Sequence, residues 1–185
     1  MKKLYFVTQN KHKVAEVGEV LKEFDVEIEQ IPMDYFEDTD DTTQEIALKA
    51  AKELANKLNK TLIVEDTGIF FKVYNNFPGV ITKRIFQAIG YEGLLKLLEG
   101  KNREAYFLVV IGYCEPGKEP VLFEGRLEGS MLEEIQGMDK DVLAYERFFK
   151  PVGYDEPMCF MSREEKNKIS HRAIAARKLG EFLTR

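Results

Sequence analysis

The sequence predicts an α/β protein with a mixed, twisted central sheet flanked by helices. Towards the N-terminus, short apolar segments alternate with segments of helical periodicity, which is the pattern of βαβ units with parallel strands. Later, two long β-prone segments follow each other with only a turn between them, which adds an antiparallel portion. With 185 residues, 44% of them hydrophobic and 32% charged, the chain is expected to fold as a single domain over residues 1–185.

The first elements follow from periodicity and capping signals. Residues 2–8 are apolar and β-prone, and a helix is expected in residues 10–24, where apolar residues recur at helical spacing. Residues 25–31 alternate like a half-exposed strand. Thr42 followed by Glu45 has the form of a capping box, which predicts a helix reaching about residue 58. We expect the next strand to be short and buried, covering residues 61–65 and ending in Glu65 to Gly68.

The second half is predicted in the same way. Helical patterns cover about residues 81–99, and two long strands cover residues 104–114 and 120–129. Ser162 and Glu165 form a second capping box, and Ser170 is the expected N-cap of the last helix. The buried face of that helix is expected to carry Ile174, Leu179, Phe182 and Leu183.

Composition excludes several classes of protein. A net charge of −5 argues against a nucleic-acid-binding protein, which presents a basic face to phosphates. The N-terminus lacks the apolar run of roughly 7 to 15 residues of a signal peptide, and residues 107–114 are far short of the roughly 18 residues that cross a bilayer. We therefore expect a cytoplasmic protein without membrane contact. Cys114 and Cys159 lie in apolar segments without CxxC spacing, so they are expected in the core.

The 27 basic residues still allow a local basic pocket, which suits a small polyanion such as a nucleotide. Residues 8–13, TQNKHK, follow the first strand and open a helix. Thr8, Asn10, Lys13 and the free backbone N–H groups can face one anion there. The alternative is that Asn10 only caps the helix and Lys13 is solvated.

A second cluster is VEDTG, residues 64–68. Two acids after a buried apolar run are costly to desolvate unless a divalent metal or lysines compensate. Mg²⁺ takes oxygen ligands and bridges carboxylates to phosphates. Glu65 and Asp66 would point to opposite faces if the strand continued through them, so one of the two would meet a given ligand. The alternative is a turn or a helix cap.

The third cluster surrounds the start of the last helix, where Lys166, His171 and Arg172 flank the break after residue 169. A pair of cations at a helix start opposes the macrodipole, which favours anions there. The mismatch indicates that His171 and Arg172 face an anionic or carbonyl-bearing ligand. For residues 163–168 a solvated run of charges is the simpler interpretation.

Together the clusters resemble the inosine triphosphate pyrophosphatase family, which hydrolyses non-canonical purine nucleoside triphosphates. The similarity spans the whole chain and rests on the order and spacing of T-x-N-x-x-K at residues 8–13, an isolated acid at Glu37, E-D-[ST]-G at 65–68, FPGV at 77–80, EGLLKLLEG at 92–100 and EEKNKISHRAIA at 164–175. It implies two lobes around a nucleotide-binding cleft, Mg²⁺ as cofactor and cleavage between the α and β phosphates.

The resemblance also implies roles for individual residues. Asp66 would take the proton of the attacking water, and Glu37, Asp66 and Glu65 are the candidate Mg²⁺ ligands. The implied substrate-binding residues are Thr8, Gln9, Asn10, Lys11, His12, Lys13, Thr67, Leu143, Ala144, Tyr145, Glu146, Lys166, His171, Arg172, Lys49 and Lys83. Lys49 also has an alternative, because Glu45 and Glu53 are its i±4 neighbours and can pair with it.

One segment departs from the family pattern. The family has an F-G-Y-D-like segment that packs on the purine, and residues 152–155, VGYD, look like the match. Too few residues separate this segment from Lys166 to leave room for the family's usual loop, so this match is rejected. Residues 143–146, LAYE, keep the family's spacing to Lys166, with Leu143 in place of a stacking aromatic and Glu146 in place of Asp. Substrate choice is therefore expected to be looser than is usual in the family.

Two other functions compete with this one. A Maf-type pyrophosphatase acting on pyrimidine or modified triphosphates has a similar fold, but Lys166 and the Ser170-His171-Arg172 ending count against it. A nucleotide-binding protein without turnover is the other, suggested by the altered pocket.

The resemblance further implies a homodimer, for which Phe70, Phe71 and Phe77 are interface candidates, with core packing as the alternative.

Overall fold

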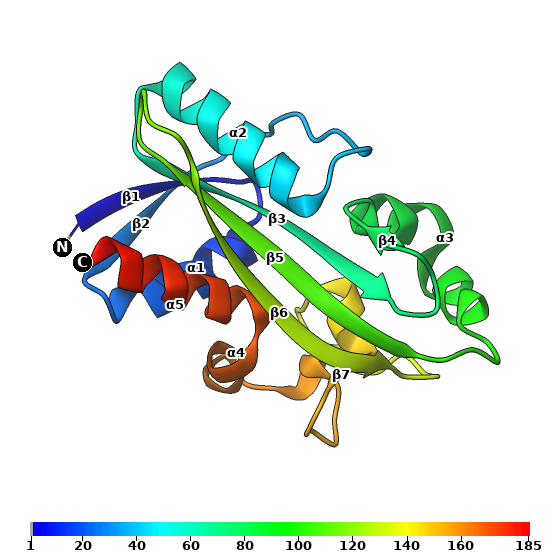
Figure 1. Cartoon of the computed structure of the whole chain (residues 1–185). Helices are drawn as coiled ribbons and strands as arrows, with labels where there is room; N and C mark the ends of the chain where they lie inside the picture. The colour runs from blue at the N-terminus through cyan, green and yellow to red at the C-terminus, as the bar shows by residue number, and fades with distance from the viewer. Residues whose placement is uncertain (1) are drawn as a thin grey trace.

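The computed structural model describes residues 2–185 and contains one sheet with helices on both faces (Figure 1). The strands are β1 (Lys2–Val7), β2 (Val26–Ile31), β3 (Leu62–Phe71), β4 (Pro78–Gly79), β5 (Glu104–Cys114), β6 (Val121–Met131) and β7 (Phe149–Pro151). The helices are α1 (Lys11–Lys22), α2 (Thr43–Leu58), α3 (Thr82–Leu97), α4 (Arg163–Ile169) and α5 (His171–Leu183), with 3-10 turns η1 (Ala144–Arg147) and η2 (Met158–Phe160).

The sheet is mixed, as predicted. Its strand order is β2-β1-β3-β5-β6-β7, and β4 pairs with β3 beside this path. β1 lies parallel to both β2 and β3, whereas all pairs from β3 to β7 are antiparallel. The α/β prediction with an antiparallel portion is therefore confirmed.

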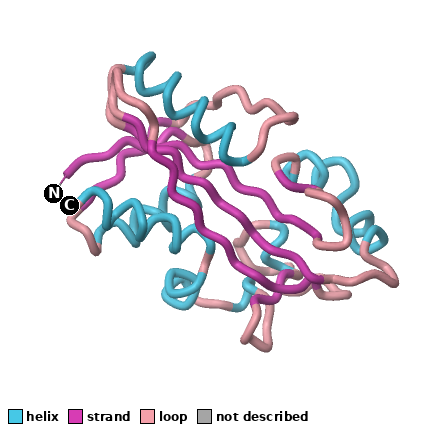
Figure 2. Tube along the Cα trace, viewed as in Figure 1, coloured by secondary structure: helices cyan, strands magenta, loops and turns pink. Residues whose placement is uncertain are grey.

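Three apolar clusters hold the layers together. The first packs α1 and α5 against one face of the sheet, and the second packs α2 against the other face (Figure 1). The third lies at the far end of the long strands β3, β5 and β6, where α3, η1, β7 and η2 gather (Figure 2). The two ends of the long strands thus belong to different packed units, and α1, η1 and α4 meet between them.

Local signals placed the helix starts correctly. Thr42 and Glu45 form the reciprocal capping box of α2, and Ser162 and Glu165 form that of α4. Ser170 caps α5 by accepting from the backbone N–H of Ala173. Helix α3 is interrupted at Gly90, where φ is 60° and ψ is −165°, so the segment predicted as helical consists of two pieces.

Two local predictions were wrong. β3 does not end at Glu65 but runs on to Phe71, because β5 pairs with it antiparallel over its whole length. Phe182 is not on the buried face of α5: its side chain is 39% exposed and meets Tyr113 and Phe123 only along its ring edge or at a tilt. The last helix instead buries mainly small residues together with Leu179.

The cysteines behave as predicted, since Cys114 and Cys159 are both free and buried. Within residues 2–185, no helix combines the length and the apolar character that a membrane span requires.

Candidate active site

The loop after β1 is organised around the start of α1. The Asn10 side chain accepts from the backbone N–H groups of His12 and Lys13, at 2.9 and 3.3 Å, and so caps the helix. Thr8 Oγ1 accepts from the backbone N–H of Asn10 at 3.1 Å. Gln9 donates to the Pro32 carbonyl oxygen, which ties the loop to the chain after β2. Asn10 therefore has the capping function that was the simpler alternative, and it holds the N-terminal amides of α1 in place.

Lys13 is not solvated, so that alternative interpretation of this side chain is wrong. Its ammonium nitrogen lies 3.2 Å from Glu65 Oε1 and 3.4 Å from the Glu65 carbonyl oxygen, and its side chain is 19% exposed. The cation therefore crosses from the first turn of α1 to the middle of β3.

Glu65 is the centre of a buried ionic network. Arg172 donates to it twice, from Nε to Oε2 at 2.8 Å and from Nη2 to Oε1 at 3.0 Å. Thr67 Oγ1 donates to Oε1 at 2.6 Å. Burial alone would raise the pKa of Glu65, but Arg172 and Lys13 hold it well below its usual range. The expectation that Glu65 binds a metal does not fit these contacts, because both of its oxygens are taken by cations and a hydroxyl.

Arg172 has a different environment from the one predicted for it. Its guanidinium is 2% exposed and binds Glu16 through Nη1 as well as Glu65. Burial lowers the pKa of the guanidinium, but the two carboxylates outweigh it and keep Arg172 charged. In this arrangement the Arg172 guanidinium holds the carboxylates of Glu16 and Glu65.

His171 is not the second cation that the start of α5 was predicted to carry. Its ring stacks on Phe107 with centroids 4.7 Å apart and planes 8° apart. Burial and the neighbouring Arg172 hold the pKa of His171 well below its usual value, so the ring is neutral at pH 7. Its Nδ1 atom is buried and lacks a hydrogen-bond partner within residues 2–185.

Asp66 lies on the opposite face of β3 from Glu65, as expected for consecutive residues of a strand. Its Oδ2 atom is buried and has no hydrogen-bond partner in the described chain. Burial raises the pKa of Asp66 to about 7, Lys13 counteracts this, and the charge of Glu37 adds to it. A buried carboxylate oxygen without a partner, next to a second carboxylate, is an arrangement that a cation would stabilise.

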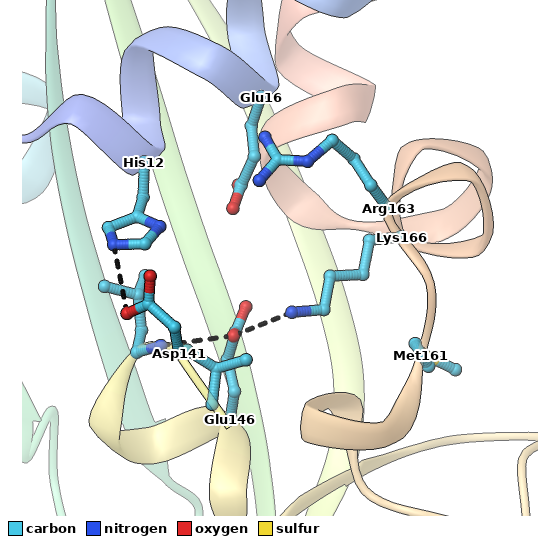
Figure 3. Close-up of a pocket in the computed structure, with 9 residues that line it drawn as sticks. His12, Glu16, Asp141, Glu146, Met161, Arg163 and Lys166 are labelled. Atoms are coloured by element: carbon cyan, nitrogen blue, oxygen red, sulfur yellow. Dashed lines mark hydrogen bonds and ion pairs between the residues drawn. The ribbon is translucent and has the colours of Figure 1, made fainter. Parts of the chain in front are cut away.

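Beside the start of α1 lies a cavity of about 280 Å³ (Figure 3). Its lining comes from α1, the segment before and within η1, and the segment from η2 into α4: His12, Glu16, Asp141, Val142, Leu143, Glu146, Met161, Arg163 and Lys166. Inside it, the Lys166 ammonium lies 2.8 Å from Glu146 Oε2. Glu146 Oε2 also accepts from the backbone N–H of Leu143 at 3.3 Å. At the rim, His12 Nε2 lies 3.7 Å from Asp141 Oδ1.

Segments 143–146 and 152–155, the two candidate matches to the base-packing segment, have different surroundings. Leu143 and Glu146 line the cavity, while Tyr154 and Asp155 are exposed on a turn in which Gly153 has φ 83°. Within the first segment, Ala144 and Tyr145 turn to the third apolar cluster, and Tyr145 donates its hydroxyl to the Thr82 carbonyl oxygen. Half of the segment thus lines the cavity and half anchors it.

The remaining predicted residues lie apart from the cavity lining. Lys49 pairs with Asp41 at 2.7 Å on the surface, and not with Glu45 or Glu53 through hydrogen bonds. Lys83 is exposed on the first turn of α3, and Lys11 is exposed on α1. None of the three forms part of the network around Glu65.

A model of the Ham1 family matches residues 4–182. The chain belongs to the Ham1 family. It is 41% identical over 181 residues to a dITP/XTP pyrophosphatase of Methanopyrus kandleri, covering 97% of this chain and 95% of the relative. It is 43% identical over 178 residues to a dITP/XTP pyrophosphatase of Methanosarcina mazei, covering 95% and 94%. A solved structure of a HAM1 protein from Coxiella burnetii matches with a TM-score of 0.83 and 25% identity, covering 100% of this chain and 99% of that one.

Several residues that line the cavity were not predicted from the sequence of this Ham1-family protein. Glu16 lies one turn after His12 on α1, so the i, i+4 spacing places both on one helix face, and that signal was available. Arg163 was assigned to a solvated charge run. Asp141 and Val142 lie in an irregular segment without periodicity, which offered no signal.

Proposed function

We propose that this protein hydrolyses non-canonical purine nucleoside triphosphates, such as ITP, dITP and XTP, to the monophosphate and pyrophosphate with Mg²⁺. The observation that carries the proposal is the position of Asp66: a buried carboxylate with an unpartnered oxygen, beside Lys13 and the capped N-terminus of α1. The names of the relatives support the substrate class.

Asp66 and Glu37 fit a Mg²⁺ ion, and Glu65 does not. The unpartnered Oδ2 of Asp66 is available, and Glu37 is exposed and close enough for its charge to raise the pKa of Asp66. Within residues 2–185, no three His, Cys, Asp or Glu side chains gather closely enough to hold a metal ion. Mg²⁺ suits such a sparse site, because it keeps several waters and takes other ligands from substrate phosphates. When bound, it would neutralise charge on the phosphate oxygens.

The phosphates would lie between the start of α1 and β3. Backbone N–H groups at a helix N-terminus bind anions, and here Asn10 and Thr8 hold that terminus in shape. Lys13 adds a cation that Glu65 orients. Asp66 would accept the proton of the attacking water, which general-base catalysis requires within hydrogen-bond reach of the carboxylate. Hydrolysis of the bond between the α and β phosphates then needs positioning and charge neutralisation more than covalent participation by the protein.

The base would occupy the cavity of Figure 3. Leu143 can cover one face of a purine, and Lys166 and Glu146 present a donor and an acceptor side by side. The cavity thus offers the Lys166 ammonium as a donor to a base carbonyl oxygen, and the carboxylates of Glu16 and Glu146 on two of its sides as alternative acceptors for a ring N–H.

A substrate panel tests the proposed function. Purified protein with MgCl₂ is assayed for pyrophosphate release from ITP, dITP, XTP, GTP, ATP and dUTP. The proposal expects release from ITP, dITP and XTP at least tenfold faster than from ATP or dUTP. Preferred release from dUTP would support the Maf-type alternative, and no release from any triphosphate would support a binding protein without turnover.

We also propose a homodimer, which the family resemblance implied. Of the three interface candidates, Phe71 is 1% exposed and belongs to the core, whereas Phe70 is half-buried and stacks on Tyr106 with centroids 4.9 Å apart. Phe77 packs against the third apolar cluster. Light scattering after gel filtration measures the mass, and Phe70→Glu is expected to shift a dimer of about 43 kDa, twice the chain mass of 21.4 kDa, towards the monomer.

A further inference from the structure

Glu16 lines the cavity and also takes part in the buried ionic network around Glu65. Its side chain, 13% exposed, lines the cavity and points into it from α1 (Figure 3). Its Oε2 atom also accepts from Nη1 of the buried Arg172, at 2.5 Å. Since Oε2 carries the bond to Arg172, Oε1 is left for a ligand in the cavity.

From Glu16, hydrogen bonds and ion pairs continue through Arg172 and Glu65 to the start of α1, where the phosphates are proposed to lie. Arg172 donates to Glu65 at 2.8 and 3.0 Å, and Glu65 in turn holds Lys13 at 3.2 Å and the Thr67 hydroxyl at 2.6 Å. The side chains of Arg172 and Glu65 are 2% and 0% exposed, so water does not compete for these bonds. The two ends of the site are therefore joined by charged groups in direct contact.

Positive and negative charges balance in this network, so a change at Glu16, its one accessible carboxylate, affects the other members. Lys13 and Arg172 carry two positive charges, and Glu16 and Glu65 carry two negative charges. Glu16 and Glu65 share one guanidinium. In a buried network of this kind a change in one bond alters the strength of its neighbours. A ligand that fixes Glu16 would also fix Arg172, and with it the Glu65 carboxylate that orients Lys13 and Thr67.

Carboxylates are acceptors only, so an occupant that binds Glu16 must donate a hydrogen bond. Hypoxanthine and xanthine carry a ring N–H next to the carbonyl group, whereas the corresponding ring nitrogen of adenine is an acceptor. Glu16 therefore matches the first group of bases and opposes adenine at that position.

We propose that Glu16 is a positioning residue that couples occupation of the cavity by a base with a ring N–H to the placement of Lys13 and Thr67 at the phosphate end. The coupling rests on the proposed function, since it assigns the cavity to the base and the start of α1 to the phosphates. Binding energy from the base would then raise the turnover number and not only the affinity.

Coupled binding tests the assignment without turnover. Titration calorimetry measures the affinity for pyrophosphate in MgCl₂, with and without saturating deoxyinosine. We expect deoxyinosine to increase the affinity of the wild-type protein for pyrophosphate about five- to twentyfold, within the usual range of coupling between sites. In Glu16→Gln the increase should fall below about twofold, while the affinity for pyrophosphate alone stays within about threefold of wild type.

The variants separate positioning from folding. Glu16→Gln keeps the shape of the side chain and an acceptor for Arg172, and Glu16→Asp keeps the charge but withdraws the carboxylate by one methylene. Both should lose the coupling, and both should lower kcat for dITP at least tenfold with KM within about threefold, because the base no longer contributes to alignment. The control is Glu19→Gln on the same helix, whose carboxylate is 49% exposed and 4.0 Å from Arg163. It should match wild type in every measurement.

Two results would overturn the inference: a wild-type affinity for pyrophosphate that deoxyinosine does not change, or a Glu16→Gln protein that keeps the wild-type increase. Neither depends on hydrolysis. A wild-type protein that releases no pyrophosphate from any triphosphate would instead contradict the proposed function, and the binding experiment would still decide whether the two ends of the site are coupled.

Discussion

The Lys166 ammonium lies 2.8 Å from Glu146 Oε2, and the two side chains are only 11% and 6% exposed. Breaking a buried pair from one side leaves an uncompensated charge. Lys166→Met is therefore expected to lower the free energy of unfolding by about 3 kcal/mol, measured by urea denaturation.

The matched control for that change lies two residues further along α4. Lys168 pairs with Glu164 at the same distance of 2.8 Å, but both side chains are largely exposed, at 65% and 81%. Exposed pairs contribute little, so Lys168→Met should not change the unfolding midpoint measurably. Equal effects of the two substitutions would show that burial of the Lys166 pair does not matter for stability.

Leu143 lines the cavity as an aliphatic residue at the position where the resemblance implies an aromatic ring. A base stacked on an aromatic ring gains roughly 1 to 3 kcal/mol in nucleic-acid complexes. Leu143→Phe is therefore expected to lower KM for dITP about fivefold or more. Steady-state pyrophosphate release measures the effect, with Leu143→Ile as a control that changes shape without adding a ring. An unchanged KM in Leu143→Phe would place the base elsewhere.

Asp66→Asn is expected to reduce turnover about 10²- to 10⁴-fold, the range for loss of a general acid or base. Asn keeps the size of the side chain but neither accepts the proton nor balances a metal ion. Pyrophosphate release from dITP and the MgCl₂ concentration for half-maximal activity are measured together. Asp155→Asn, on the exposed turn after β7, is the control and should leave both unchanged. Turnover above one tenth of wild type in Asp66→Asn would remove Asp66 from the role of base.

Local signals were sufficient for much of the fold. Capping boxes and helical spacing placed α2, α4 and α5, because these features act between residues three or four apart. The apolar run before Glu65 also predicted a buried strand. Its true end at Phe71 depends on pairing with β5, whose residues lie more than thirty positions later in the chain, so local pattern did not indicate it.

Some residues of the candidate site could likewise be predicted from local pattern, whereas the long-range contacts between them could not. Residues 8–13 and the carboxylates of β3 were found because strand ends and paired acids stand out in a sequence. The bond from Glu16 to Arg172 joins residues 156 positions apart, and no spacing rule predicts it. The protonation state of His171 was misjudged for the same reason, since the stacked Phe107 comes from a distant strand and burial depends on tertiary packing.

Gly125 marks the closest approach between β6 and α5. A Cβ atom at this position would lie 1.8 Å from the His171 carbonyl oxygen and 2.8 Å from the Ala175 backbone nitrogen. Neither backbone atom can move without displacing the start of α5, which carries Arg172. Gly125→Ala is therefore expected to destabilise the fold by about 3 kcal/mol, at the upper end for overpacked cores. Activity should fall with it, because Arg172 would no longer meet Glu65 and Glu16.

Gly18→Ala is the opposite case and serves as the control. Gly18 lies within α1, and a Cβ atom there would meet Ile28 at 3.8 Å, an ordinary contact. Because Ala favours the helix over Gly by about 0.5 to 1 kcal/mol, this substitution should stabilise the protein. Urea denaturation of the two variants should thus give changes of opposite sign. A Gly125→Ala protein as stable as wild type would mean that α5 and β6 can separate freely, and that the network around Arg172 does not depend on their contact.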